Sequence, residues 1–121
     1  MIKLELPFPP SVNSAYANGG NKRGRHKTAK YNDWIKLAST KVKESHRQRL
    51  GPYSLQIALM PPDKRARDLG NLEKCVSDFL VMHQIVRDDR FCRRITLYWA
   101  ENLPSPCVVL VQKASEEDLA I

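Results

Sequence analysis

Acidic and basic side chains gather in one short block of the sequence, and their types suit phosphodiester chemistry. The block spans residues 62–74 and reads Pro-Asp-Lys-Arg-Ala-Arg-Asp-Leu-Gly-Asn-Leu-Glu-Lys. Hydrolysis of a phosphodiester needs carboxylates that hold a hard cation such as Mg²⁺, together with basic groups that assist the reaction. Within this block, Asp68 is the candidate metal ligand and Lys74 is the candidate catalytic lysine.

Two further carboxylates, Asp88 and Asp89, lie in a polar loop between a predicted helix and a predicted strand. Because they belong to a separate loop, they could meet Asp68 in space, and the three residues form the candidate metal-ligand set. Ordinary structural explanations stay open. Asp68 could accept backbone N–H groups at the start of a helix, Asp88-Asp89 could form a polar turn, and Lys74 could face solvent.

The charge of the chain indicates a polyanionic partner. The 121 residues carry a formal net charge of +7, and neutralising phosphate charge releases counterions and drives association. Residues 6–32 contain no acidic residue, and a segment rich in Gly and Asn predicts a basic loop there. The candidate nucleic-acid-binding residues are Lys22, Arg23, Arg25, Lys27, Lys64, Arg65 and Arg67, and the basic surface would extend over Arg87, Arg90, Arg93 and Arg94. Such charge runs can also be plain solvated surface.

Length and cysteine usage limit the class of protein. A chain of 121 residues predicts a single domain over residues 1–121. The cysteines Cys75, Cys92 and Cys107 are odd in number and form no Cys-x-x-Cys pair. That pattern argues against a disulfide framework or a zinc site. It is typical of a reducing compartment, so we expect the protein to lie in the cytoplasm. The longest apolar run, residues 107–111, is too short to span a membrane, so we expect no membrane partner.

Hydrophobic periodicity predicts six main elements. Apolar residues alternate in the strands and recur at helical spacing in the helices. The predicted strands are residues 2–6, 53–60, 92–100 and 107–112, and the predicted helices are residues 30–46 and 71–83. This order, β-α-β-α-β-β, favours an α/β (α+β) two-layer sandwich of one small mixed β-sheet and two helices. The strand at 107–112 should be buried on both faces, Cys75 and Cys107 should lie in the core, and the tail at 114–121 should be frayed.

Two blocks of the chain resemble the RusA family of Holliday junction resolvases. The first is Leu-Pro-Phe-Pro-Pro-Ser-Val-Asn at residues 6–13, followed by Tyr16 and the basic loop. The second is the block at residues 62–74, followed by Asp78 and the Asp88-Asp89 pair. The resemblance covers nearly the whole chain. It implies a Mg²⁺-dependent endodeoxyribonuclease that binds four-way junction DNA as a homodimer and makes paired symmetric nicks.

The resemblance also assigns the catalytic residues. The family's central motif reads Asp-x-Asp-Asn, and by this match Asp68 is its first aspartate, Asp89 the distal aspartate and Lys74 the lysine needed for cleavage. Gly70 stands where the family has its second aspartate. Either Glu73, Asp88 or water fills the gap and cleavage survives, or the protein binds junctions and cuts them poorly. Mg²⁺ often needs only one or two protein carboxylates, which favours retained cleavage.

A third class, an RNA-binding or translation-associated basic domain, is also compatible with the positive charge. The sequence has only three Phe and lacks the aromatic motif that RNA-recognition domains use for base stacking. These features weigh against RNA as the substrate.

Overall fold

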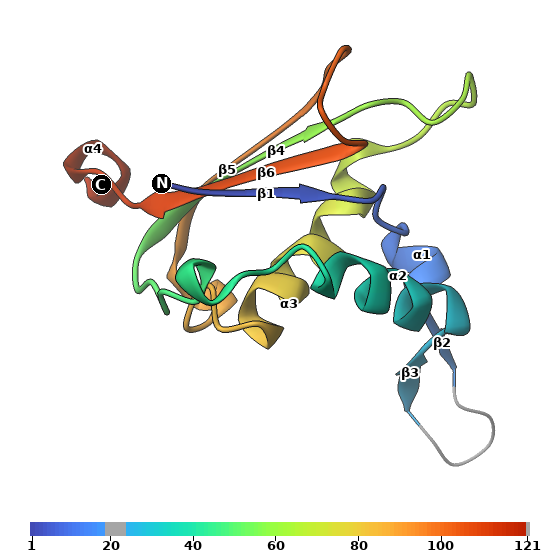
Figure 1. Cartoon of the computed structure of the whole chain (residues 1–121), viewed down its shortest axis with the longest axis horizontal. Coiled ribbons are helices and arrows are strands. Elements are labelled where there is room, and N and C mark those ends of the chain that lie inside the picture. Colours follow the sequence, from blue (N-terminus) through green and yellow to red (C-terminus); the bar gives the residue numbers. More distant parts are fainter. Residues whose placement is uncertain (19–23, 121) are drawn as a thin grey trace.

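The chain folds into two layers, a β-sheet and the helices beneath it (Figure 1). The computed structural model describes residues 1–18 and 24–120. The predicted α+β class and the order of the main elements are confirmed. These elements are β1 (Ile2–Leu6), α2 (Ala29–Ser39), β4 (Tyr53–Leu59), α3 (Glu73–Met82), β5 (Cys92–Trp99) and β6 (Cys107–Lys113).

The main sheet is mixed, as predicted, and has the strand order β1-β6-β4-β5. Strand β6 pairs antiparallel with both β1 and β4, whereas β4 and β5 are parallel. The helix α3 forms the crossover between these two parallel strands, as parallel pairing requires. One face of the sheet packs on the helices, and the hydrophobic core lies between the two layers. Cys75 and Cys107 are buried in this core, as predicted.

Position in the sheet decides how deeply each strand is buried. Residues Cys107, Val108 and Val109 of the central strand β6 are all buried, which confirms the prediction for this part of the strand. The alternation of Ile95, Leu97 and Trp99 predicted β5 correctly. Among the described residues, however, β5 is an edge strand, and Ile95 on it is 43% exposed.

Helix α2 is shorter than the predicted helix at 30–46, because hydroxyl groups close its last turn. The Ser39 hydroxyl donates to the carbonyl of Ile35 (2.6 Å), and the Thr40 hydroxyl donates to that of Leu37 (2.7 Å). Such bonds compete with continuation of the helix. The chain then turns and forms the short 3₁₀ helix η1 (Glu44–His46). Among the described residues, no helix combines the length and apolar character that crossing a membrane requires.

The prediction of a basic loop is partly wrong, because residues 16–18 and 25–27 form a β-hairpin. Strands β2 (Tyr16–Asn18) and β3 (Arg25–Lys27) pair antiparallel after a short helix α1 (Val12–Ala15). The Thr28 hydroxyl closes the hairpin by donating to the carbonyl of Ser14 (2.7 Å). These strands are too short and too polar to show an apolar alternation. The predicted DNA-binding residues Lys22 and Arg23 lie outside the described residues.

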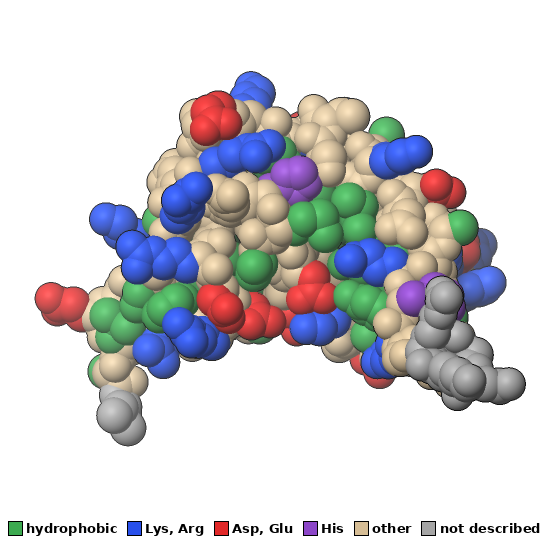
Figure 2. All heavy atoms as spheres, turned by 90° about the horizontal axis from the view of Figure 1, so that it is seen from below, with side chains coloured by type: hydrophobic (Ala, Val, Ile, Leu, Met, Phe, Trp, Pro, Cys, Tyr) green, Lys and Arg blue, Asp and Glu red, His purple; other side chains and the backbone are tan. Residues whose placement is uncertain are grey.

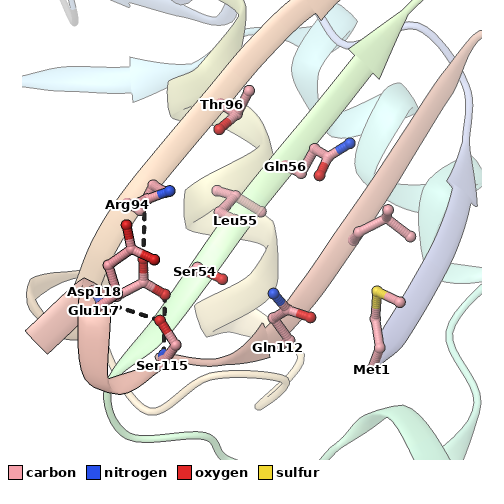
Figure 3. A pocket seen from close by; sticks show the side chains of 11 residues that line it. Met1, Ser54, Leu55, Gln56, Arg94, Thr96, Gln112, Ser115, Glu117 and Asp118 are labelled. Carbon is pink, nitrogen blue, oxygen red and sulfur yellow. Dashed lines mark hydrogen bonds and ion pairs between the residues drawn. The ribbon is translucent and has the colours of Figure 1, made fainter.

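The C-terminal segment was predicted to be frayed, and this is wrong for residues 115–120. Helix α4 (Glu116–Leu119) follows Ser115, whose side chain caps it by accepting the N–H of Asp118 (3.1 Å). Arg94 of β5 points toward Asp118 and forms an ion pair of 2.9 Å with it (Figure 3). This contact lines a hollow of about 250 Å³ over β4, β5 and β6, which contains none of the predicted metal-binding or catalytic residues. Arg94, predicted as part of the basic surface, is paired here with a carboxylate.

Candidate active site and nucleic-acid interface

The two acidic segments of the site pack against the same helix. Asp68 caps the 3₁₀ helix η2 (Leu69–Leu72), which leads directly into α3. Asp88 caps the 3₁₀ helix η3 (Asp89–Phe91), which leads into β5. Both η2 and η3 contact α3. The fold therefore places Asp68 just before α3 and the Asp88-Asp89 segment against this helix, although the whole of α3 separates the two in the sequence.

Lys74, in the first turn of α3, lies between two carboxylates. Its Nζ atom is 3.0 Å from Oδ1 of Asp78 and 3.8 Å from Oδ2 of Asp89, and its side chain is 49% exposed. The hydrogen bond to Asp78 is the main cause that raises the pKa of Lys74 above its ordinary value. The structure thus brings the predicted catalytic residues Lys74 and Asp89 together and keeps Lys74 positively charged.

Asp88 and Asp89 form an acidic pair at the start of η3. The Asp88 side chain accepts the N–H of Arg90 at 3.0 Å. This bond, followed by a hydrogen bond with Asp89, lowers the pKa of Asp88. Asp88 therefore stabilises the polar turn, which was one of the roles that the sequence left open. Its lowered pKa also keeps it ionised beside Asp89.

Asp68 has the helix-start role that the sequence left open. Its Oδ1 atom accepts the N–H of Gly70 at 3.1 Å. Within the described residues, Asp68 makes no hydrogen bond or ion pair with Asp88, Asp89 or Lys74. It lines a hollow of about 300 Å³ that is separate from the one at Asp88 and Asp89. The capping bond occupies one carboxylate oxygen and leaves the other to face this hollow or a ligand.

The donors available to a metal ion fit Mg²⁺ in their chemistry. Asp68, Asp88 and Asp89 supply only carboxylate oxygens, which are the ligands that hard cations prefer. In residues 1–18 and 24–120, no three His, Cys, Asp or Glu side chains surround a common ion position. Mg²⁺ usually keeps several waters and takes one or two protein carboxylates. The carboxylate donors of these residues therefore suit a hard cation by their chemistry.

The backbone at Gly70 has room for a Cβ atom. A Cβ atom at this position would meet only Oδ1 of Asp68, at 3.5 Å, which is an ordinary van der Waals contact. Glycine is thus not required here by lack of space. An aspartate at position 70 would place its carboxyl group close to Asp68.

Sequence reasoning assigned no role to two polar residues beside Lys74. The Tyr16 hydroxyl, at the base of the hairpin, donates to Oδ2 of Asp78 at 2.8 Å. Burial and then this hydrogen bond raise the pKa of Tyr16, so it stays protonated as the donor. The position of Asp78 four residues after Lys74 was a usable signal, because side chains at this spacing meet on a helix. The contact with Tyr16 had no sequence signal.

Basic residues of the hairpin lie close to the acidic pair. Lys27 lines a hollow of about 390 Å³ with Tyr16, Asp78, Asp88 and Asp89. The guanidinium of Arg25 lies 5.0 Å from the centre of the Tyr16 ring, a cation–π geometry. In Figure 2, acidic side chains gather at a hollowed edge of the molecule, and Lys and Arg side chains flank them.

The second basic group lies in the loop before η2 and consists of two exposed residues and one paired residue. Lys64 and Arg65 are exposed. Arg67 is ion-paired with Asp63, and its guanidinium lies 5.9 Å from the centre of the Phe8 ring. The hydrogen bond from Arg67 is the largest cause that lowers the pKa of Asp63 to about 2. The structure therefore offers Lys64 and Arg65 to a ligand and uses Arg67 to anchor the loop.

The chain matches the model of a known protein family. The family model described as endodeoxyribonuclease RusA matches residues 7–110. This range begins in the proline-rich segment after β1 and contains Asp68, Lys74, Asp78, Asp88 and Asp89. No curated protein matches the chain.

Proposed function

Because this chain belongs to the RusA family of endodeoxyribonucleases, we propose that it resolves four-way DNA junctions by Mg²⁺-dependent, paired symmetric nicks. The family makes it a DNA-cleaving hydrolase of the Holliday junction resolvase type, which acts in recombination and repair. One observation carries the assignment of its active site: Lys74 lies 3.8 Å from Asp89 beside the basic hairpin. A cationic group and a metal-ligand carboxylate are both needed at a phosphate undergoing hydrolysis.

The roles of the acidic residues follow from their chemistry and exposure. Asp68 and Asp89 would hold the Mg²⁺ ion, and Asp88, next to Asp89, would add negative charge beside it. When bound, Mg²⁺ activates water and offsets the negative charge that develops on the phosphate. Asp88 is held ionised by the N–H of Arg90, which keeps negative charge beside the ion without help from position 70.

Lys74 would act on the phosphate itself. Its ammonium group is half-exposed and stays charged beside Asp78. It can therefore donate a hydrogen bond to a non-bridging phosphate oxygen, or a proton to the departing 3′ oxygen. Both actions stabilise the charge of the transition state more than that of the bound substrate, which is the condition for catalysis.

Exposed basic residues of two segments would bind the DNA backbone. Arg25 and Lys27 stand on the hairpin, and Lys64 and Arg65 stand on the loop before η2. We place Lys22 and Arg23, outside the described residues, in the same role, with a smaller part for the paired Arg67. Arg94 is left out, because it pairs with Asp118.

We further propose that the 121 residues act as one domain and as a homodimer in the cytoplasm. Paired nicks need one active site on each of two opposed strands, which a two-fold symmetric dimer supplies. The DNA substrate and the free thiols of Cys75, Cys92 and Cys107 favour a reducing compartment.

The test uses a synthetic four-way junction labelled on each strand in turn, incubated with the protein and either Mg²⁺ or EDTA. We expect nicks at symmetric positions on two opposed strands, only with Mg²⁺. Cleavage in EDTA would contradict the metal requirement, and equal cleavage of linear duplex would contradict junction specificity.

A second function, junction binding with little cleavage, is favoured by one observation. Gly70 supplies no carboxylate at the position where the family motif has its second aspartate. A protein of this kind would bind the junction with the same salt dependence as a cleaving enzyme, and it would leave the DNA strands intact in Mg²⁺. The substitution Gly70→Asp separates the two functions, as set out in the Discussion.

A further inference from the structure

Asp78 uses both of its carboxylate oxygens to connect α3 with the hairpin. Its Oδ1 atom lies 3.0 Å from Nζ of Lys74, and its Oδ2 atom accepts the Tyr16 hydroxyl at 2.8 Å. The side chain is 26% exposed, so water reaches it less than it reaches Lys74. With both oxygens engaged, the carboxylate has a single orientation relative to Lys74.

The ammonium group of Lys74 therefore forms a closer contact with Asp78 than with Asp89. The distance to Asp78 is a hydrogen-bonding distance, whereas the 3.8 Å to Asp89 leaves a looser ion pair. The lysine side chain is long and flexible, so its ammonium group moves to the nearest carboxylate when one partner is removed. Without Asp78, the nearest remaining carboxylate is Asp89.

We propose that Asp78 is a positioning residue that holds the ammonium group of Lys74 off Asp89 and so leaves the Asp89 carboxylate open to the divalent ion. An ammonium group and a metal ion compete for the same carboxylate oxygens. The proposal rests on the proposed function in taking Asp89 as an ion ligand and Lys74 as the catalytic lysine. Asp78 itself touches neither ion nor substrate.

Tyr16 supports this arrangement from the hairpin side. Its ring and that of the buried Tyr31 pack in an edge-to-face arrangement, with ring centres 5.3 Å apart, and the guanidinium of Arg25 lies over the Tyr16 ring. The hydroxyl is thereby fixed in place and holds Oδ2 of Asp78. Loss of the hydroxyl would free Asp78 to rotate and would weaken its hold on Lys74, with a smaller effect than loss of the carboxylate.

The test measures Mn²⁺ binding to the whole protein without DNA, by electron paramagnetic resonance of the free ion. We expect Asp78→Asn to weaken Mn²⁺ binding by about tenfold, the scale of losing a residue that orients a metal ligand. Tyr16→Phe should weaken it less. Tyr98→Phe is the matched control, because the Tyr98 hydroxyl accepts from Gln56 instead of contacting the site.

The double variant Asp78→Asn with Lys74→Ala distinguishes competition from general damage. Once the competing ammonium group is gone, Mn²⁺ affinity should return to that of Lys74→Ala alone, a non-additive result. Asp78→Asn with wild-type affinity, or a double variant as weak as Asp78→Asn, would overturn the proposal, and so would a wild-type protein that binds no Mn²⁺. If Asp78→Asn fails to fold, the same comparison is made with Tyr16→Phe.

Failure here is distinguishable from failure of the proposed function. A wild-type protein that binds Mn²⁺ but never cuts a junction contradicts the nuclease role and leaves the competition measurable. Unchanged Mn²⁺ affinity in Asp78→Asn, with normal cleavage by the wild type, contradicts only the role of Asp78.

Discussion

The Nζ atom of Lys74 lies 3.8 Å from Oδ2 of Asp89, which joins the first turn of α3 to the 3₁₀ helix before β5. This pair connects two segments that α3 and a following loop separate in the sequence. It unites the cationic and the anionic group that hydrolysis of a phosphodiester needs, and Asp89 lines a hollow with Lys27 of the hairpin.

Removing either member of this pair should abolish most cleavage without affecting junction binding. We expect Lys74→Ala and Asp89→Asn each to lower the single-turnover rate by about 100-fold, the usual effect of losing one group that stabilises the transition state. Binding in EDTA should stay within about twofold, because phosphate contacts elsewhere supply most of the affinity. Lys36→Ala, at an exposed position on α2, is the control. Wild-type rates in both variants would remove the two residues from the mechanism.

Restoring a carboxylate at position 70 should strengthen ion binding. Gly70→Asp fits the available space, since its Cβ would meet only Asp68 at 3.5 Å. We expect about tenfold tighter Mg²⁺ binding and a modest change in the rate at saturating Mg²⁺. Gly70→Asn, of equal size and without charge, is the control. A rate gain of about 100-fold or more at saturating Mg²⁺ would instead identify the wild-type protein as a junction binder that has lost its chemistry.

The loop before η2 should contribute to DNA affinity through charge alone. We expect Lys64→Ala with Arg65→Ala to weaken junction binding and to reduce the slope of log affinity against log salt by about two, roughly 0.9 for each phosphate that is no longer neutralised. Lys41→Ala with Lys43→Ala is the matched control. These two residues line a hollow with Lys3 and Glu5 of β1. Strand β1 forms the edge of the sheet opposite to β5. Equal weakening of affinity in both pairs would show that net charge matters and position does not.

The anchor of the same loop should respond to acid. Arg67 is the main cause that lowers the pKa of Asp63 from 3.8 to about 2. Because the folded value is depressed, the ion pair stabilises the loop above about pH 4 and is lost as the pH falls from about 4 to about 2. An NMR titration of the Asp63 carboxyl carbon measures this directly. In Arg67→Gln the midpoint should return toward 3.8, and an unchanged midpoint would show that Arg67 does not hold Asp63 in solution.

The sequence predicted the elements whose side chains pack in the core. Apolar residues alternate in β1, β4 and β6 and recur at helical spacing in α3, because one face of each element is buried against the other layer. This burial produces the periodic pattern that can be recognised in the sequence. The extent of α2 could not be predicted, because hydroxyl-to-carbonyl bonds at Ser39 and Thr40 end it while the apolar pattern continues. The hairpin and α4 depend on local side-chain hydrogen bonds at Thr28 and Ser115 and carry no periodic signal.

The sequence proposed a set of candidate site residues, and the structure shows how part of that set is arranged. The family motif identified Lys74 and Asp89, and the structure brings them together. It could not identify Tyr16 as the partner of Asp78, because that contact depends on how the hairpin packs on α3. The ion pair between Arg67 and Asp63 could not be predicted either. A run of basic residues has the same sequence pattern whether or not its side chains form ion pairs.

Whether Asp68 and Asp89 hold one ion between them is the question on which the nuclease mechanism depends. A crystal of the wild-type protein grown with Mn²⁺ and measured at the manganese absorption edge would locate the ion by its anomalous signal. We predict one ion with an oxygen of Asp68 and an oxygen of Asp89 both at coordination distance, about 2.0–2.4 Å. An ion held by only one of the two carboxylates, or by neither, would contradict the shared site.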